Sequence, residues 1–153
     1  MRRSWVPTLG CAVAVLAGCG PGATPISPGC TEDVAPVIRA LERAPAAVTL
    51  VDGSRLSECI SDGTDEAELL NVGITFSRAA EELRVTAREQ EDRAVAVQLG
   101  YLIGATRRGA ERTAGVMSEL QRRVELVGGR LQTEAPDLAA DVDRGLAAGE
   151  KTG

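Results

Sequence analysis

The side chains best suited to catalysis in this 153-residue chain are carboxylates, because the chain contains no histidine. Without histidine, the Ser–His–Asp, Cys–His and zinc-hydrolase mechanisms are excluded. Glu81 is followed by Glu82, and a second acidic group comprises Glu89, Glu91 and Asp92. A glycosidase uses two acids of this kind, but it needs them in a cleft that shifts their pKa values. Both groups lie in polar runs typical of exposed helix surface, so we expect no catalytic residue.

Familiar motifs of catalysis and metal binding are missing from the sequence. It contains no G-x-S-x-G nucleophile elbow, P-loop, Rossmann glycine fingerprint or S-x-x-K motif. Residues 62–65 offer oxygen ligands for calcium, but their spacing is not that of an EF-hand, and Thr64 is better suited to cap the helix that follows. We therefore expect no cofactor, no metal site and no enzymatic activity, and keep an enzyme acting through a carboxylate pair as a third hypothesis.

The first 18 residues have the pattern of a targeting segment. Arg2 and Arg3 form a basic start, and residues 6–17 are mostly apolar. An apolar stretch of about a dozen residues is too short to span a bilayer of roughly 30 Å. The segment ends in Leu16-Ala17-Gly18-Cys19, a run that resembles the lipobox of bacterial lipoprotein precursors.

The resemblance to lipoprotein precursors covers residues 1–19 only. It implies that the Cys19 thiol takes a diacylglyceryl thioether, that a signal peptidase removes residues 1–18, and that the lipid holds the chain on the extracytoplasmic face of the cell membrane. An ordinary secretory signal with a chance cysteine, or a buried N-terminal helix, is the alternative. The export route stays open, because residues 2–5 match only part of a twin-arginine signal.

Two of the four cysteines remain for a disulfide. Cys11 leaves with the signal segment and Cys19 is consumed by the lipid, which leaves Cys30 and Cys59. In an exported chain such a pair is normally bonded, and closing a loop of about 30 residues stabilises the fold by roughly 3 to 4 kcal/mol in the chain-entropy model. A redox-active or metal-binding pair is the alternative, but there is no CxxC motif to support it.

Composition and charge limit the fold and the partners. The share of apolar residues, 44%, is ordinary for a globular protein, and the aromatic share of 2% disfavours a β-sandwich or barrel. Removal of residues 1–18 leaves 15 basic and 22 acidic residues, a net charge of −7. We expect no nucleic-acid partner, because a polyanion needs a concentrated basic face. Five arginines lie close together in the chain: Arg107, Arg108, Arg112, Arg122 and Arg123. They could contact lipid headgroups, but ion pairing with nearby glutamates is the simpler interpretation.

The chain after the anchor divides into three parts. Residues 19–29 form a Pro/Gly-rich linker, residues 30–131 a helical domain, and residues 132–153 a weakly ordered tail that contains a short amphipathic helix. A short helix is expected to begin after Asp33 as its N-cap. Residues 48–51 are a β-branched run closed by the Asp52-Gly53 turn, which predicts a short strand; a strand or short helix carrying Cys59 follows.

Two long helices are expected between residues 65 and 127. Apolar or small residues recur every three or four positions along each of them, and the second ends at Gly128-Gly129. In the first helix this stripe consists of Leu69, Val72, Phe76, Ala79, Leu83 and Thr86. The polar segment 88–93 separates them, and Asp92 could cap the second. We expect an antiparallel hairpin in which Leu83 lies near Leu99 and Phe76 is buried; a single continuous rod is the alternative, because the joint has no Gly or Pro.

Small residues in the second helix allow another backbone to approach closely. Gly100, Gly104 and Gly109 are spaced to lie on or near one face. Tight packing inside the hairpin is the simpler interpretation, and homodimerisation through this face is the alternative. The most apolar stretch after the signal, residues 94–106, is too short for a membrane span.

The sequence therefore predicts a mainly α fold class: a long antiparallel helical hairpin with a disulfide-linked N-terminal helix and a short β-like segment. Its expected function is that of a lipid-anchored, extracytoplasmic cell-envelope lipoprotein acting as a non-catalytic helical interaction module. Its expected partners are the membrane, through the lipid, and an envelope protein or a second copy, through the helices. A carrier of a small apolar ligand in a helical pocket is the second hypothesis.

Overall fold

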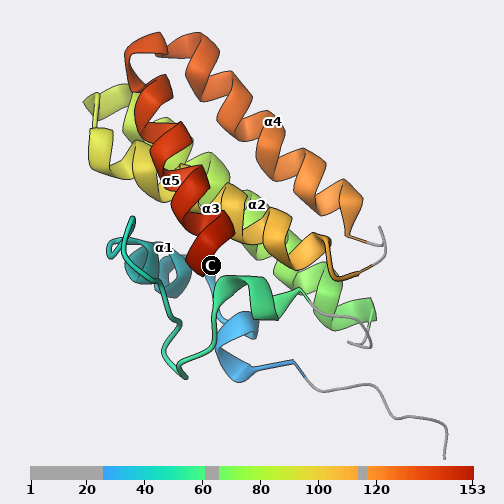
Figure 1. Cartoon of the computed structure of the whole chain (residues 1–153). Coiled ribbons are helices and arrows are strands. Elements are labelled where there is room, and N and C mark those ends of the chain that lie inside the picture. Colours follow the sequence, from blue (N-terminus) through green and yellow to red (C-terminus); the bar gives the residue numbers. More distant parts are fainter. Residues whose placement is uncertain (1–25, 61–65, 114–116) are drawn as a thin grey trace, which may run out of the picture.

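The computed structural model describes residues 26–60, 66–113 and 117–153, and these residues form helices (Figure 1). The α-helices are α1 (Val34–Leu41), α2 (Glu66–Gln90), α3 (Arg93–Ala110), α4 (Ser118–Glu134) and α5 (Ala139–Thr152). The 3₁₀ helices are η1 (Pro28–Thr31), η2 (Leu56–Cys59) and η3 (Pro136–Leu138). No strand occurs in the three described ranges. The mainly α fold class is confirmed. Cys19 and residues 20–25 of the expected linker lie outside the described residues, whereas residues 26–29 are described, and Pro28 and Gly29 begin η1 with Gly29 buried.

The α2–α3 pair forms the expected hairpin, not a continuous rod. Glu91 adopts a left-handed backbone conformation with φ 51°, which ends α2 although the joint has no Gly or Pro. Asp92 then caps α3 as expected, because its carboxylate accepts hydrogen bonds from the amides of Ala94 and Val95 at 2.8 and 3.1 Å.

The expected second helix of the hairpin is two helices, which corrects the sequence-based prediction. α3 ends at Ala110, and α4 begins at Ser118 and continues to Glu134, past Gly128-Gly129. Gly128 faces Ile103, where a Cβ atom would come within 2.5 Å of the isoleucine Cδ1. This glycine therefore allows α4 to pack against α3 and does not end a helix.

Helix α5 corrects a second prediction, that of a weakly ordered tail. Residues 139–152 form one helix, longer than the short one expected there, and Gly149 is buried in it. The spacing Gly145-x-x-x-Gly149 matches Gly100-x-x-x-Gly104 of α3, and each glycine lies against backbone of the other helix. The close packing expected of the α3 glycines is present, but their partner is α5.

Helices α3 and α5 run parallel. Near their starts, Arg93 lies 3.3 Å from Asp141. Near their ends, Arg108 donates hydrogen bonds to the carbonyl oxygens of Glu150 and Lys151 at 2.9 and 2.6 Å. These carbonyls belong to the last turn of α5, which has no intrahelical donors left for them. Arg108 thus holds the end of α5 against α3.

Helices α2 and α4 also run parallel to each other and antiparallel to α3. Gly73 of α2 lies level with Leu120 of α4, and Arg84, further along α2, pairs with Glu134 near the end of α4. Figure 1 shows α2 to α5 side by side with their axes roughly aligned. The chain runs one way in α2 and α4 and the opposite way in α3 and α5. The first turns of α2 and α4 consequently lie at the same end of the molecule.

The N-terminal part is fastened by the predicted disulfide. Cys30 and Cys59 are bonded with a Cα–Cα distance of 5.3 Å, and both are buried. The prediction of a helix with Asp33 at its N-cap position is confirmed by α1, although the Asp33 side chain makes no capping hydrogen bond. Cys59 lies on a short helix, η2, the second of the two conformations expected for it.

The short strand expected at residues 48–51 is absent. Val48 and Leu50 are buried, so the run does contribute to the core. The Val48 amide, however, donates to the Tyr101 hydroxyl at 3.0 Å instead of to a neighbouring strand. The same hydroxyl lies 2.9 Å from the Thr152 hydroxyl oxygen of α5. The run thus has no strand partner, and it is held by the Tyr101 hydroxyl at Val48 and by the Leu50 amide, which donates to the Ser54 carbonyl oxygen at 2.8 Å.

No helix among the described residues combines the length and apolarity that crossing a bilayer requires.

Candidate functional site

The acidic groups considered for catalysis lie on or just after α2 and are paired with arginine where they approach other helices. Glu81 lies 2.6 Å from Arg84 of its own helix and 3.8 Å from Arg130 of α4. The hydrogen bond from Arg84 holds the pKa of Glu81 below its usual range, even though partial burial opposes this. A general acid requires the opposite shift, so this carboxylate is suited to binding arginine and not to donating a proton.

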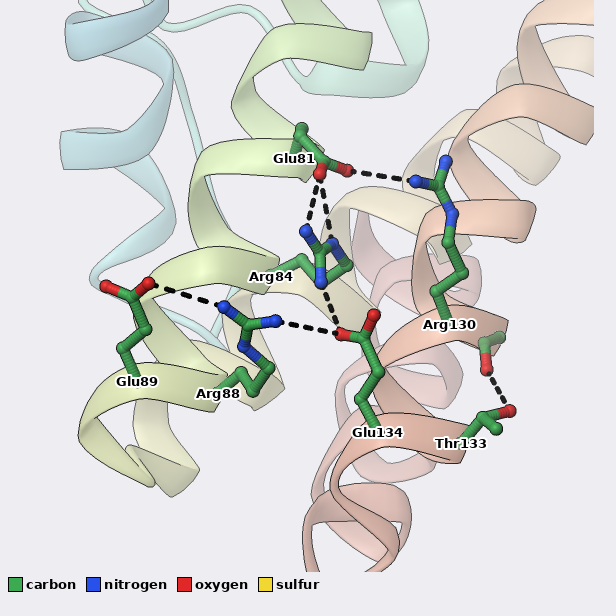
Figure 2. Close-up of polar contacts among 8 residues, drawn as sticks. Glu81, Arg84, Arg88, Glu89, Arg130, Thr133 and Glu134 are labelled. Atoms are coloured by element: carbon green, nitrogen blue, oxygen red, sulfur yellow. Dashed lines mark hydrogen bonds and ion pairs between the residues drawn. The ribbon is translucent and has the colours of Figure 1, made fainter.

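Arg84 is the centre of an ion-pair cluster that joins α2 to α4 (Figure 2). Its side chain is largely buried, and it contacts both Glu81 and Glu134. Arg88 reaches the same Glu134 carboxylate at 4.0 Å and Glu89 at 3.3 Å. Removing one partner of a buried charge leaves the other uncompensated, so such a cluster holds two helices in one register.

The other half of the α2–α4 interface is apolar and open to solvent. There the two helices border a groove of about 310 Å³, lined by Leu69, Leu70, Gly73, Ile74, Ser77, Met117, Glu119, Leu120 and Arg123. We call this the α2–α4 groove. It lies along the first turns of both helices, whereas the ion-pair cluster lies towards their ends.

Two large apolar side chains on one edge of the α2–α4 groove lack cover. Leu70 is 64% exposed and Ile74, one turn later, is 48% exposed. On the floor, Leu120 approaches Gly73, where a Cβ atom would lie 3.9 Å from the leucine Cδ1. Because glycine has no Cβ atom, Gly73 leaves room between α2 and α4. Exposed apolar groups in a hollow of this kind mark contact surfaces.

Glu119 on the α4 side of the groove is paired with two arginines, which leaves one net positive charge there. Glu119 accepts hydrogen bonds from Arg122 at 2.9 Å and from Arg123 at 2.8 Å. These bonds lower the pKa of Glu119 to about 2. The carboxylate therefore loses its charge only in strongly acidic solution, and the groove keeps a paired, polar border beside its apolar edge.

The described chain begins next to the first turns of α2. The Ile26 amide donates to a Glu68 carboxylate oxygen at 3.3 Å. Asp52 fixes the following residues by accepting hydrogen bonds from the Ser27 hydroxyl and from the Gly29 amide. The Ser27 bond, with those from Ser54 and Gly29, holds the pKa of Asp52 well below its usual range. The linker therefore enters the domain at the end that carries the α2–α4 groove.

The basic side chains late in the predicted second helix do not form one free patch. Arg107 pairs with Glu125 at 2.6 Å and with Glu150 at 3.0 Å, and Arg108 binds the end of α5. Arg122 and Arg123 share Glu119, as described above. Ion pairing, the simpler interpretation of these residues, accounts for Arg107, Arg122 and Arg123, whereas Arg108 binds backbone carbonyl oxygens.

Sequence reasoning identified the core stripe of α2 but missed the groove. Val72 and Phe76, which belong to the predicted stripe, are fully buried. Leu70 and Ile74 form a second pair with a spacing of four, just beside that stripe. A helix with one buried face should be polar outside its core stripe. The apolar pair Leu70 and Ile74 outside that stripe was therefore the sequence signal for a second contact surface.

Among the described residues, no cluster of three or more acidic or cysteine side chains is placed to hold a metal ion. Comparisons of the chain with protein-family models, with curated proteins and with solved structures find no match.

Proposed function

We propose that this protein is a lipid-anchored lipoprotein on the extracytoplasmic face of the cell membrane, and that its helical domain is a non-catalytic interaction module. On this proposal the Cys19 thioether ties the chain to the membrane, and the α2–α4 groove provides a contact surface. An envelope protein or a second copy of the chain would meet the module through its helices.

The proposed anchor is supported by the residues before the domain. A basic start, a short apolar stretch and the lipobox-like run Leu16 to Cys19 occur in the right order. The Pro/Gly-rich linker that follows suits a tether between a lipid and a folded domain. The bond between Cys30 and Cys59 also suits an oxidising compartment outside the cytoplasm.

The observation that carries the proposed contact role is the exposure of Leu70 and Ile74 beside the α2–α4 groove. Further along the two helices, the ion-pair cluster around Arg84 joins α2 to α4. The open half thus has apolar area that a binding partner would remove from water.

A carrier of a small apolar ligand is the second candidate function. Ligand sites usually enclose about 300 to 1,000 Å³, and the α2–α4 groove, at about 310 Å³, lies at the lower limit of that range. The groove is open along one side, which favours contact with a larger partner over enclosure of a small one.

Replacement of Cys19 by alanine should abolish the anchor. In a bacterial host with lipoprotein processing, the Cys19→Ala chain should accumulate as the full-length precursor, without lipid. Intact-mass spectrometry of the membrane fraction measures both the mass of the lipid and the cleavage site. Cys11→Ala is the matched control and should be processed normally. An unmodified wild-type chain, or an N-terminus other than Cys19, would contradict the proposed anchor.

A photoreactive side chain at Ile74 should cross-link to a neighbouring molecule in intact cells. Leu126 of α4 is the matched control, because it is 50% exposed against 48% for Ile74 but does not line the groove. We expect adducts from the Ile74 position and few from the Leu126 position, measured by mass spectrometry after irradiation. Equal yields at both positions, or none at either, would show that the groove is not a contact surface.

A further inference from the structure

We propose that the α2–α4 groove packs on the bilayer to which Cys19 is tied, with Leu70 and Ile74 in the membrane interface. This inference rests on the proposed lipid anchor. It names the partner of the groove as lipid and not another protein, and it gives the domain a defined orientation on the membrane.

The length of the tether carries the first step. Ile26 is held to Glu68 in the first turns of α2. Six residues, 20–25, separate it from the proposed lipid attachment at Cys19, and the seven residue steps from Cys19 to Ile26 span at most roughly 23 to 25 Å when fully extended. The start of α2 therefore stays within that distance of the bilayer surface, whatever the conformation of the linker.

The position of the exposed side chains carries the second step. Leu70 lies four residues after the start of α2 at Glu66, which is about 6 Å along the helix axis. Leu70 lies on the opposite flank of α2 from Glu68. This adds little to its distance from the tether, because a helix is only about 10 to 12 Å across. Leu70 and Ile74 are thus within reach of the surface to which so short a tether holds this end.

The chemistry of the groove suits the membrane interface. Its edge presents two aliphatic side chains, and its α4 side presents Glu119 and Arg123, which are paired with each other. Apolar groups of a surface-bound helix enter the headgroup and acyl boundary by about 5 to 10 Å. Glu119 offsets one of the two charges of its partners Arg122 and Arg123, so a single positive charge remains on this side, and contact through the apolar edge does not depend on anionic lipid.

The tether makes a weak apolar contact sufficient. Two side chains alone give little affinity for a membrane from free solution. A short flexible link, however, sets an effective concentration on the order of millimolar. The two acyl chains of the proposed Cys19 thioether already suffice for stable attachment, so contact through the groove would set the orientation of the domain and not its attachment. The far end of α2, at Gln90, would then point away from the bilayer.

Tryptophan fluorescence tests the orientation, because the one tryptophan, Trp5, lies in the segment expected to be cleaved. The full chain is produced in a lipoprotein-processing host with Ile74→Trp or, as control, with Gln90→Trp at the exposed end of α2. Both proteins are reconstituted in phosphatidylcholine vesicles with and without acyl-brominated phosphatidylcholine. Brominated chains quench tryptophan on contact, so the emission of the Ile74→Trp protein should fall to about half or less, whereas the Gln90→Trp protein should be unaffected.

Three results would overturn the inference. Equal quenching of both proteins, or none in the vesicle-bound Ile74→Trp protein, would show that the groove does not meet the bilayer. Sedimentation that shows an Ile74-dependent dimer, with no quenching, would assign the groove to a second copy. If the Ile74→Trp chain fails to fold by circular dichroism, Leu70→Trp takes its place.

Failure of the anchor itself is measured separately. Intact mass shows whether Cys19 carries lipid, and residual Trp5 emission from wild type shows uncleaved precursor. If Cys19 is unmodified, the proposed function fails. A chain beginning at Cys19 retains all residues of the described core and has one free thiol, because Cys30 and Cys59 are bonded. Coupling that thiol to a maleimide lipid then tests the groove alone, with the same expected quenching.

Discussion

Gly100→Ala should destabilise the protein by about 3 kcal/mol or more, the upper part of the range for overpacked cores. A Cβ atom at Gly100 would lie 2.0 Å from the carbonyl oxygen of Val142 in α5. Backbone cannot move aside as the end of a flexible side chain can, so α3 and α5 would have to separate. Urea unfolding followed by circular dichroism measures the loss.

The matched control for Gly100→Ala is Gly129→Ala. Gly129 is also inside a helix, but a Cβ atom there would meet nothing within 4 Å. Alanine should therefore stabilise α4 by about 0.5 to 1 kcal/mol through its better helix propensity. Gly145→Ala, which meets the Val97 carbonyl oxygen at 2.0 Å from the other side of the interface, should match Gly100→Ala. A similar change for the Gly100 and Gly129 variants would refute the close α3–α5 packing.

Phe76→Ala should cost about 3 to 5 kcal/mol, the range for truncating a buried aromatic ring. Phe76 is fully buried, and it is the only phenylalanine in the chain. The surrounding helices are held by the ion-pair cluster and by the α3–α5 glycines, so the cavity should close only in part. Thermal and urea unfolding of the monomer measure the change.

Ile74→Ala, two residues away on the same helix, is the control for Phe76→Ala. Ile74 is 48% exposed, so its truncation removes less buried area and should cost less than about 1 kcal/mol. If Phe76→Ala instead weakened only association between chains and left monomer stability unchanged, Phe76 would lie at an interface between chains, as the continuous-rod alternative requires.

The features set by local residue spacing, or by a count of one residue type, could be predicted from the sequence. Val72, Phe76 and Leu83 recur at helical spacing, and this periodicity identified the buried face of α2. Asp92 was identified as the cap of α3 because an N-cap bonds amides two and three residues ahead. The bond between Cys30 and Cys59 followed from counting the cysteines left after export. Each prediction needed only a short stretch of chain or a small set of residues.

The partners of the glycines and the position of the groove were decided by tertiary structure. Gly100 and Gly104 signalled a close approach, but the approaching helix is α5, more than 30 residues later, where the tail was expected to be weakly ordered. No local pattern states which backbone fills a gap between small residues.

The sequence by itself determined the helical class, the hairpin, the disulfide and the residues on which the proposed anchor rests. The end of α3 at Ala110, the return of α4 along α2 and the exposure of Leu70 and Ile74 were decided only in three dimensions. The physical reason is that helix formation and capping are set by bonds within a few residues. Whether an apolar side chain is covered depends on which distant helix packs beside it, and none of the described helices covers Leu70 and Ile74.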